Sequence, residues 1–147
     1  MSEVKISTKG RYSLRLLLDL AAHRGGGFVS LNDIAERQGI SKKYLEQLVT
    51  LLKPSDLLRI GRGPTGGYML AKAPEEITVG QVLRLAEGGL CPVPCLEDSP
   101  SRCEQSGSCN TRSIWRGLQE VVETYLDGIT LQRILDDQNG VADEYYI

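Results

Sequence analysis

Residues 30–52 read SLNDIAERQGISKKYLEQLVTLL, and this stretch decides the fold. Ser30 is a typical N-cap, and an acidic side chain three residues later fits a capping box. Gly39 follows about two helical turns further on, where a helix commonly ends in a left-handed residue. Ser41 then begins a second helix, whose apolar residues recur at helical spacing. A short helix, a glycine turn and a second helix together predict a helix-turn-helix unit.

The flanking segments complete a winged helix. Residues 8–24 predict a preceding helix with Thr8 as its cap, and the glycines at 25–27 end it. After the helix-turn-helix, two β-like segments at 57–60 and 68–70 flank a glycine-rich reversal. A β-hairpin in this position is the wing of a winged helix.

The second half of the chain predicts helices that meet a partner. Pro74 ends the first domain, and Thr78 caps a helix that runs to about Glu87. A long helix at 111–127 has one apolar side, and a last short helix follows Thr130. The apolar side consists of Ile114, Trp115, Leu118, Val121, Val122, Tyr125 and Leu126. A small domain cannot cover this stripe as well as its own core, so we expect a helix from a second subunit to cover it, with packing on the same chain as the alternative.

These elements predict a mainly α-helical fold with a small β wing. Residues 1–73 form a winged helix-turn-helix DNA-binding domain. Residues 74–147 form dimerisation helices with a cysteine-rich sensor loop at 88–110. Structureless loops of that length are uncommon in compact domains and are usually functional or disordered. Four cysteines within the loop favour an organised site.

Composition and charge are those of a globular protein with a basic first half. The chain has 147 residues and a net charge of −2. It contains no apolar run of membrane-spanning length and no secretory signal, so we expect a cytoplasmic protein without a membrane partner. Residues 1–72 hold twelve Lys and Arg against six acids, whereas residues 73–147 hold five against thirteen. The asymmetry fits a nucleic-acid partner for the first domain, although ordinary scatter of surface charge explains it equally well on its own.

The second helix of the helix-turn-helix begins with residues suited to DNA. Two lysines there would neutralise phosphate, while Glu46 and Gln47 would read base edges in the major groove. Arg59 and Arg62 bracket the hairpin turn, and an arginine at a hairpin tip suits a narrow minor groove. The wing glycines allow close approach to a sugar–phosphate backbone, or merely permit the turn.

Three groups of residues resemble the Rrf2 family of bacterial winged-helix regulators. They are TKGRY at 8–12, IAERQGIS at 34–41 with YLEQL at 44–48, and RG at 62–63 with GGY at 66–68. The resemblance covers nearly the whole chain. It implies a homodimer, held by the long C-terminal helix, that binds a partly palindromic double-stranded DNA operator. We expect the protein to act as a repressor. Glu46, Gln47 and Arg62 match positions that family members use on DNA. Together with the residues of the motifs above, the candidate DNA contacts are Thr8, Lys9, Arg11, Tyr12, Ser41, Lys42, Lys43, Tyr44, Glu46, Gln47, Arg59, Arg62, Gly63, Gly66 and Gly67.

The predicted sensor loop contains Cys91, Cys95, Cys103 and Cys109. Cytosolic thiols are kept reduced, so clustered cysteines are more often metal ligands or redox switches than structural disulfides. The cluster-binding branch of the family has three cysteines in this loop, which the last three here match. Its members use a histidine or an aspartate as the fourth ligand, where this chain has Arg112 or Arg11. We therefore expect Cys91 as the fourth ligand of an iron–sulfur cluster of the [2Fe–2S] type.

Two other chemistries fit the same cysteines. Zinc accepts four thiolates, although the later gaps exceed those of a common zinc knuckle. A thiol or disulfide switch needs no metal. The C-terminal residues Tyr145, Tyr146 and Ile147 resemble those of the family's cysteine-metabolism repressors, which implies a cysteine-biosynthesis enzyme as a possible further partner. An enzyme is not expected, because the chain lacks a Cys-x-x-Cys spacing and its single histidine provides no Ser/His/acid set.

Overall fold

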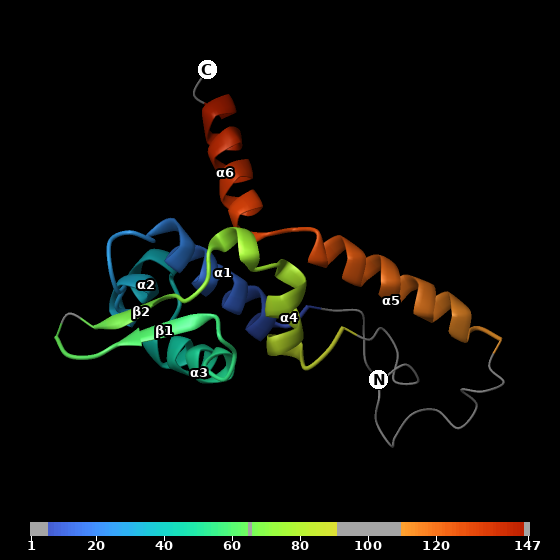
Figure 1. Cartoon of the computed structure of the whole chain (residues 1–147), viewed down its shortest axis with the longest axis horizontal. Helices are drawn as coiled ribbons and strands as arrows, with labels where there is room; N and C mark the ends of the chain where they lie inside the picture. Colours follow the sequence, from blue (N-terminus) through green and yellow to red (C-terminus); the bar gives the residue numbers. More distant parts are fainter. Residues whose placement is uncertain (1–5, 65, 91–109, 146–147) are drawn as a thin grey trace.

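A computed structural model describes residues 6–64, 66–90 and 110–145, with side chains described as far as residue 139. Figure 1 shows α1 to α4 and the β-hairpin gathered into one body, from which α5 and α6 extend in different directions. The elements are α1 (Thr8–Ala22), α2 (Leu31–Gln38), α3 (Lys42–Leu52), β1 (Leu58–Gly61), β2 (Gly67–Leu70), the 3₁₀ helix η1 (Pro74–Glu76), α4 (Val79–Glu87), α5 (Arg112–Asp127) and α6 (Leu131–Tyr145). The mainly helical fold with a small wing is confirmed. Within the described ranges, no helix has the length and hydropathy needed to cross a membrane.

Hydroxyl caps set the helix starts. The Ser30 and Ser41 side chains accept hydrogen bonds from the third backbone N–H beyond them, both at 3.2 Å, and Gly39 ends α2 at φ 66°. These predictions are confirmed. The predicted cap of α1 is wrong, because Thr8 already lies inside the helix and Ser7 accepts the bond from the Gly10 N–H at 3.2 Å.

The wing is attached to the body by more than its two strands. β1 and β2 pair antiparallel, with Ile60 opposite Tyr68. Val29, in the loop before α2, exchanges two backbone hydrogen bonds of 2.8 Å with Tyr68 and so adds a bridge that the sequence did not predict. Gly67 leaves room for this bridge, since a Cβ there would collide with the Val29 carbonyl. The hairpin is therefore held against the helix-turn-helix.

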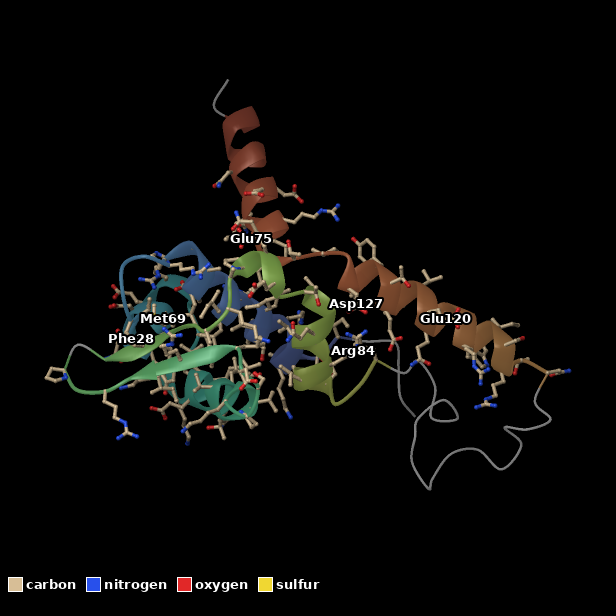
Figure 2. The ribbon with its side chains drawn as sticks, in the orientation of Figure 1. Phe28, Met69, Glu75, Arg84, Glu120 and Asp127 are labelled. Atoms are coloured by element: carbon tan, nitrogen blue, oxygen red, sulfur yellow. The ribbon has the colours of Figure 1, made fainter. Side chains whose placement is uncertain are left out.

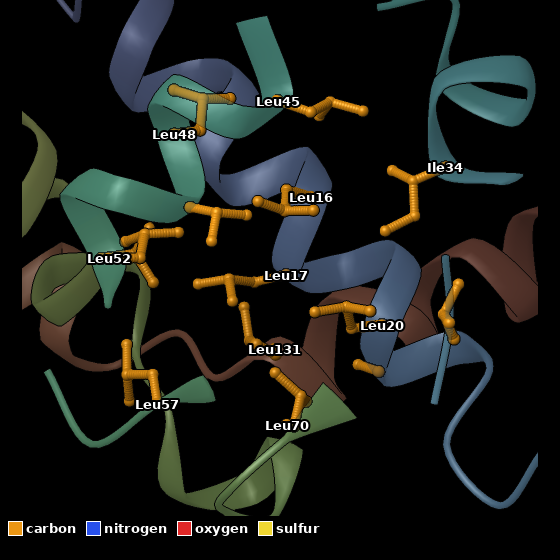
Figure 3. Close-up of a cluster of buried hydrophobic side chains, with 14 of the residues drawn as sticks. Leu16, Leu17, Leu20, Ile34, Leu45, Leu48, Leu52, Leu57, Leu70 and Leu131 are labelled. Atoms are coloured by element: carbon orange, nitrogen blue, oxygen red, sulfur yellow. The ribbon is translucent and has the colours of Figure 1, made fainter. Parts of the chain in front are cut away.

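One cluster of buried apolar side chains joins the helices of the body to the hairpin and to the start of α6 (Figure 3). Leu16, Leu17, Leu45 and Leu52 are fully buried within it. The cluster continues past residue 74, where the second domain was predicted to begin, and Leu131 at the start of α6 is fully buried in it. The division into two domains stays a prediction, but α4 packs with the first. The last helix was expected to be short and instead spans fifteen residues.

A buried carboxylate connects α1 to α2. Asp19 is only 4% exposed, and it accepts hydrogen bonds from Arg37 Nε and Nη2 at 3.0 and 2.7 Å. Gln38 Nε2 donates a third at 2.9 Å. Burial raises the pKa of Asp19, but the bonds from Arg37 and Gln38 outweigh burial and hold that pKa below its usual value. This ionised side chain fixes the first helix of the helix-turn-helix against α1.

Candidate nucleic-acid interface

The first turns of α3 present a polar face to solvent. The exposed side chains there are Ser41, Lys42, Lys43, Glu46 and Gln47. On the opposite side of the helix, Leu45, Leu48 and Leu52 are buried in the core. Within the described part of the chain, the two lysines, Glu46 and Gln47 make no side-chain hydrogen bond or ion pair. They are therefore available to a ligand without breaking an internal contact.

The hairpin carries the second group of predicted contacts, and its tip projects from the body in Figure 1. Arg59 on β1 and Arg62 at the start of the turn are both exposed. Gly63 has φ 87°, and its carbonyl accepts the Gly66 N–H at 3.0 Å. A Cβ on Gly66 would collide with the Gly61 carbonyl. Gly63, Gly66 and Gly67 are thus needed to form the turn, whatever they contact.

The start of α1 carries the third group. Thr8, Lys9 and Arg11 are exposed, and Arg11 Nη2 donates to Thr8 Oγ1 at 3.3 Å. The Tyr12 ring meets the Tyr44 ring edge-on, with 5.8 Å between their centroids. Both tyrosines are half-buried against the core. The pair thereby joins α1 directly to α3, a contact that the sequence did not predict.

Arg15 was missed by the sequence reasoning. Its guanidinium carbon lies 5.3 Å from the Tyr12 ring centroid, and its nitrogens donate to Gln38 Oε1 at 3.2 Å and to the Gln38 carbonyl at 2.8 Å. Arg15 therefore connects α1 to the last turn of α2. The available signal was its place four residues after Arg11, which puts both cations on one side of α1.

The apolar stripe of α5 is uncovered in the chain as described. No α5 residue is buried, and Val121 and Tyr125 are each 67% exposed. Ile114, Trp115 and Leu118 are also exposed, while Val122 and Leu126 are half-buried. Monomeric proteins rarely expose a contiguous apolar stripe of this kind. Among the described residues α5 packs on its own chain mainly against α4, and this contact leaves most of the stripe exposed.

The proposed metal ligands Cys91, Cys95, Cys103 and Cys109 lie outside the described residues. The same holds for most of the predicted sensor loop and for Tyr146 and Ile147 at the C-terminus. Among the residues that are described, no group of three His, Cys, Asp or Glu side chains could hold a metal ion. The proposed ligand set therefore stays a prediction.

Comparisons with known proteins give the chain its relatives. Residues 6–137 match the model of the family Rrf2, described as "Iron-dependent Transcriptional regulator". The HTH-type transcriptional regulator IscR of Aliivibrio salmonicida is 40% identical over 134 residues, which cover 91% of this chain and 79% of that protein. The structure of CymR, the global cysteine regulator of B. subtilis, has a TM-score of 0.73 and 40% identity, covering 88% of this chain and 95% of that one.

A solved IscR gives a similar result. The structure of T. potens IscR has a TM-score of 0.72 and 41% identity, and it covers 91% of this chain and 88% of that chain. The relatives are transcription regulators and not enzymes, which confirms the expectation from the sequence. The chain belongs to the Rrf2 family and is a DNA-binding transcription regulator with a winged-helix fold.

Proposed function

We propose that this regulator is a homodimeric repressor that binds a palindromic operator through α3 and the wing. The observation that carries the proposal is the exposed polar face at the start of α3, combined with an exposed Arg62 on a hairpin held against the same body. Helices in this position read base edges in the major groove, and wing arginines enter the minor groove. Thr8, Lys9 and Arg11 would add phosphate contacts from α1.

The dimer would form through the apolar stripe of α5. Val121 and Tyr125 are the most exposed members of the stripe, and a second copy of the same helix offers a complementary surface. Such an interface is isologous, so the two recognition helices would be related by a two-fold axis. A palindromic operator is the DNA counterpart of that symmetry.

The sensor in this proposal is an iron–sulfur cluster held by Cys91, Cys95, Cys103 and Cys109. Four thiolates are the donor set that such clusters most simply take, and the [2Fe–2S] form is the one proposed. The similarity to IscR regulators and membership of a family of iron-dependent transcriptional regulators support an iron cofactor. When bound, the cluster would supply redox chemistry to the loop between α4 and α5. The protein's own part would be to link that loop to DNA through the contacts of α4 with α1.

A second candidate keeps the DNA-binding role and changes the sensor. The similarity to CymR, the global cysteine regulator of B. subtilis, favours zinc or a metal-free thiol switch in the same four cysteines. In that case a cysteine-biosynthesis enzyme would be a further partner.

Metal analysis of protein purified without oxygen distinguishes the candidates. We expect a brown protein with near-equal iron and sulfide, whose colour is lost in both Cys95→Ala and Cys91→Ala. Colour that survives Cys91→Ala would move the fourth ligand elsewhere, and a colourless sample containing zinc or no metal would support the second candidate. DNA binding is tested on the same samples: affinity should fall steeply with salt and weaken in Arg62→Ala. Arg24→Ala, at an exposed arginine outside the predicted contact set, is the matched control.

A further inference from the structure

The short connection between α5 and α6 is attached to the start of α4. The Val79 N–H donates to the Ile129 carbonyl at 2.8 Å, and the Leu131 N–H donates to the Ile77 carbonyl at 3.0 Å. Because α4 packs against α1 in the common core, these bonds fix one end of α5 to the DNA-binding body. A single point of attachment still leaves the direction of α5 open.

A second attachment lies further along α4. Arg84 Nη1 and Nη2 donate to the two carboxylate oxygens of Asp127, both at 2.7 Å. Figure 2 shows the two labelled side chains facing each other across the gap between α4 and α5. Glu123 lies 4.0 Å from the same guanidinium. A two-pronged guanidinium–carboxylate pair constrains orientation as well as distance, so it restrains the direction in which α5 leaves the body.

Gly80 allows this pair to form. A Cβ at residue 80 would collide with Asp127 Oδ1 and lie 3.2 Å from Arg84 Nη1. Gly80 is the second residue of α4, so the carboxylate also lies beside the positive end of that helix. The Arg84 guanidinium thus binds the Asp127 carboxylate, and the N-terminus of α4 also stabilises its negative charge.

We infer that Arg84, Asp127 and Gly80 are positioning residues that set the spacing between the two operator half-sites. The inference rests on the proposed dimer. In that dimer, each α3 packs with its own α4, and α5 is the element that joins the two bodies. The sixteen residues of α5 span about 24 Å at 1.5 Å per residue. A change of about 10° at the joint therefore moves its far end by about 4 Å, close to the 3.4 Å rise of one base pair.

The test measures spacing preference directly. The probe is the palindromic duplex that the wild-type protein selects from random DNA, together with versions whose spacer is one or two base pairs longer or shorter. We expect wild-type protein to lose about 10-fold in affinity per base pair of altered spacing, because the second half-site rotates out of register. In Arg84→Gln, Asp127→Asn and the double variant, that loss should shrink to less than about threefold. The double variant should lose as little affinity per altered base pair as the single variants do, since all three remove the same ion pair.

Two further variants separate positioning from folding and charge. Gly80→Ala displaces the Asp127 carboxylate without changing any charge, so it should relax the spacing preference in the same way. The helix itself should be kept, because alanine favours helical structure more than glycine does. The double variant Arg133→Gln/Asp137→Asn changes the same charges at exposed positions of α6 and should keep the wild-type preference. Binding to a duplex with one half-site, and the melting temperature, should be unchanged in all of them.

The outcomes distinguish the inference from the function on which it rests. If wild-type protein binds the palindrome with a sharp spacing preference and the Arg84, Asp127 and Gly80 variants keep it, the inference is wrong and the proposed function stands. If wild-type protein is monomeric, or binds without salt dependence and without a two-fold site, the proposed function fails and the inference fails with it.

Discussion

Replacing Arg37 with methionine tests whether the buried Asp19 carboxylate depends on its guanidinium partner. The change keeps much of the side-chain volume and removes the bonds of 3.0 and 2.7 Å to Asp19, whose side chain is 1% exposed. Breaking a buried ion pair by removing one partner costs about 3–5 kcal/mol. Arg37 is itself 35% exposed, and Gln38 still donates to the carboxylate, so we expect about 2–3 kcal/mol.

Urea unfolding at a fixed protomer concentration would measure this change. A loss of that size corresponds to a melting temperature lower by about 5–10 °C in a chain of this length. Arg24→Met, at an exposed arginine, should stay within about 0.5 kcal/mol of wild type. In Asp19→Asn/Arg37→Met the buried charge is gone, so the double variant should be more stable than the sum of the two single changes predicts. An Arg37→Met protein as stable as the Arg24→Met control would refute the reasoning.

Three other predictions concern acid stability, DNA binding and the core. The pKa of Asp19 in the folded protein is held below its unfolded value, which is near 3.9. The stability that the ionised carboxylate contributes is therefore present above about pH 4 and is lost as pH falls through the folded pKa. Asp19→Asn should accordingly lose less unfolding free energy than wild type between pH 6 and pH 3. Lys42→Gln should lower the slope of log affinity against log salt by about 1.8 if each of the two lysines in the proposed dimer neutralises one phosphate, and an unchanged slope would place Lys42 off the DNA. Leu48→Ala, at a side chain 1% exposed, should cost about 2–5 kcal/mol in urea unfolding, and a smaller loss would mean that the core closes over the cavity.

The sequence predicted the elements that are specified locally. Ser30, Gly39 and Ser41 define the helix-turn-helix because a cap and a left-handed turn depend on neighbouring residues alone. The choice between Ser7 and Thr8 could not be made in this way, since both carry a hydroxyl. Ser7 is distinguished by a distant contact: its N–H and hydroxyl donate to Glu87 at 2.8 and 2.7 Å.

Contacts between residues far apart in the chain were the ones that periodicity could not reveal. Arg84 and Asp127 are separated by 43 residues, and Val29 reaches Tyr68 from the loop before α2. Neither pairing leaves a local pattern, because each depends on how whole elements pack. The exposed residues of α3 could be predicted for the opposite reason: the spacing of Leu45 and Leu48 assigns one face to the core and leaves the other to solvent.

That division of α3 bears on how such a regulator could diverge. Its buried residues hold the helix in place, whereas Lys42, Lys43, Glu46 and Gln47 support nothing else within the described part of the chain. Exchanging those four would cost the fold little, since surface substitutions away from such contacts usually change stability by about 0.5 kcal/mol or less. A duplicated gene could therefore acquire a new DNA specificity in a few steps while the buried core stays intact, and the same four positions are where an engineer would begin.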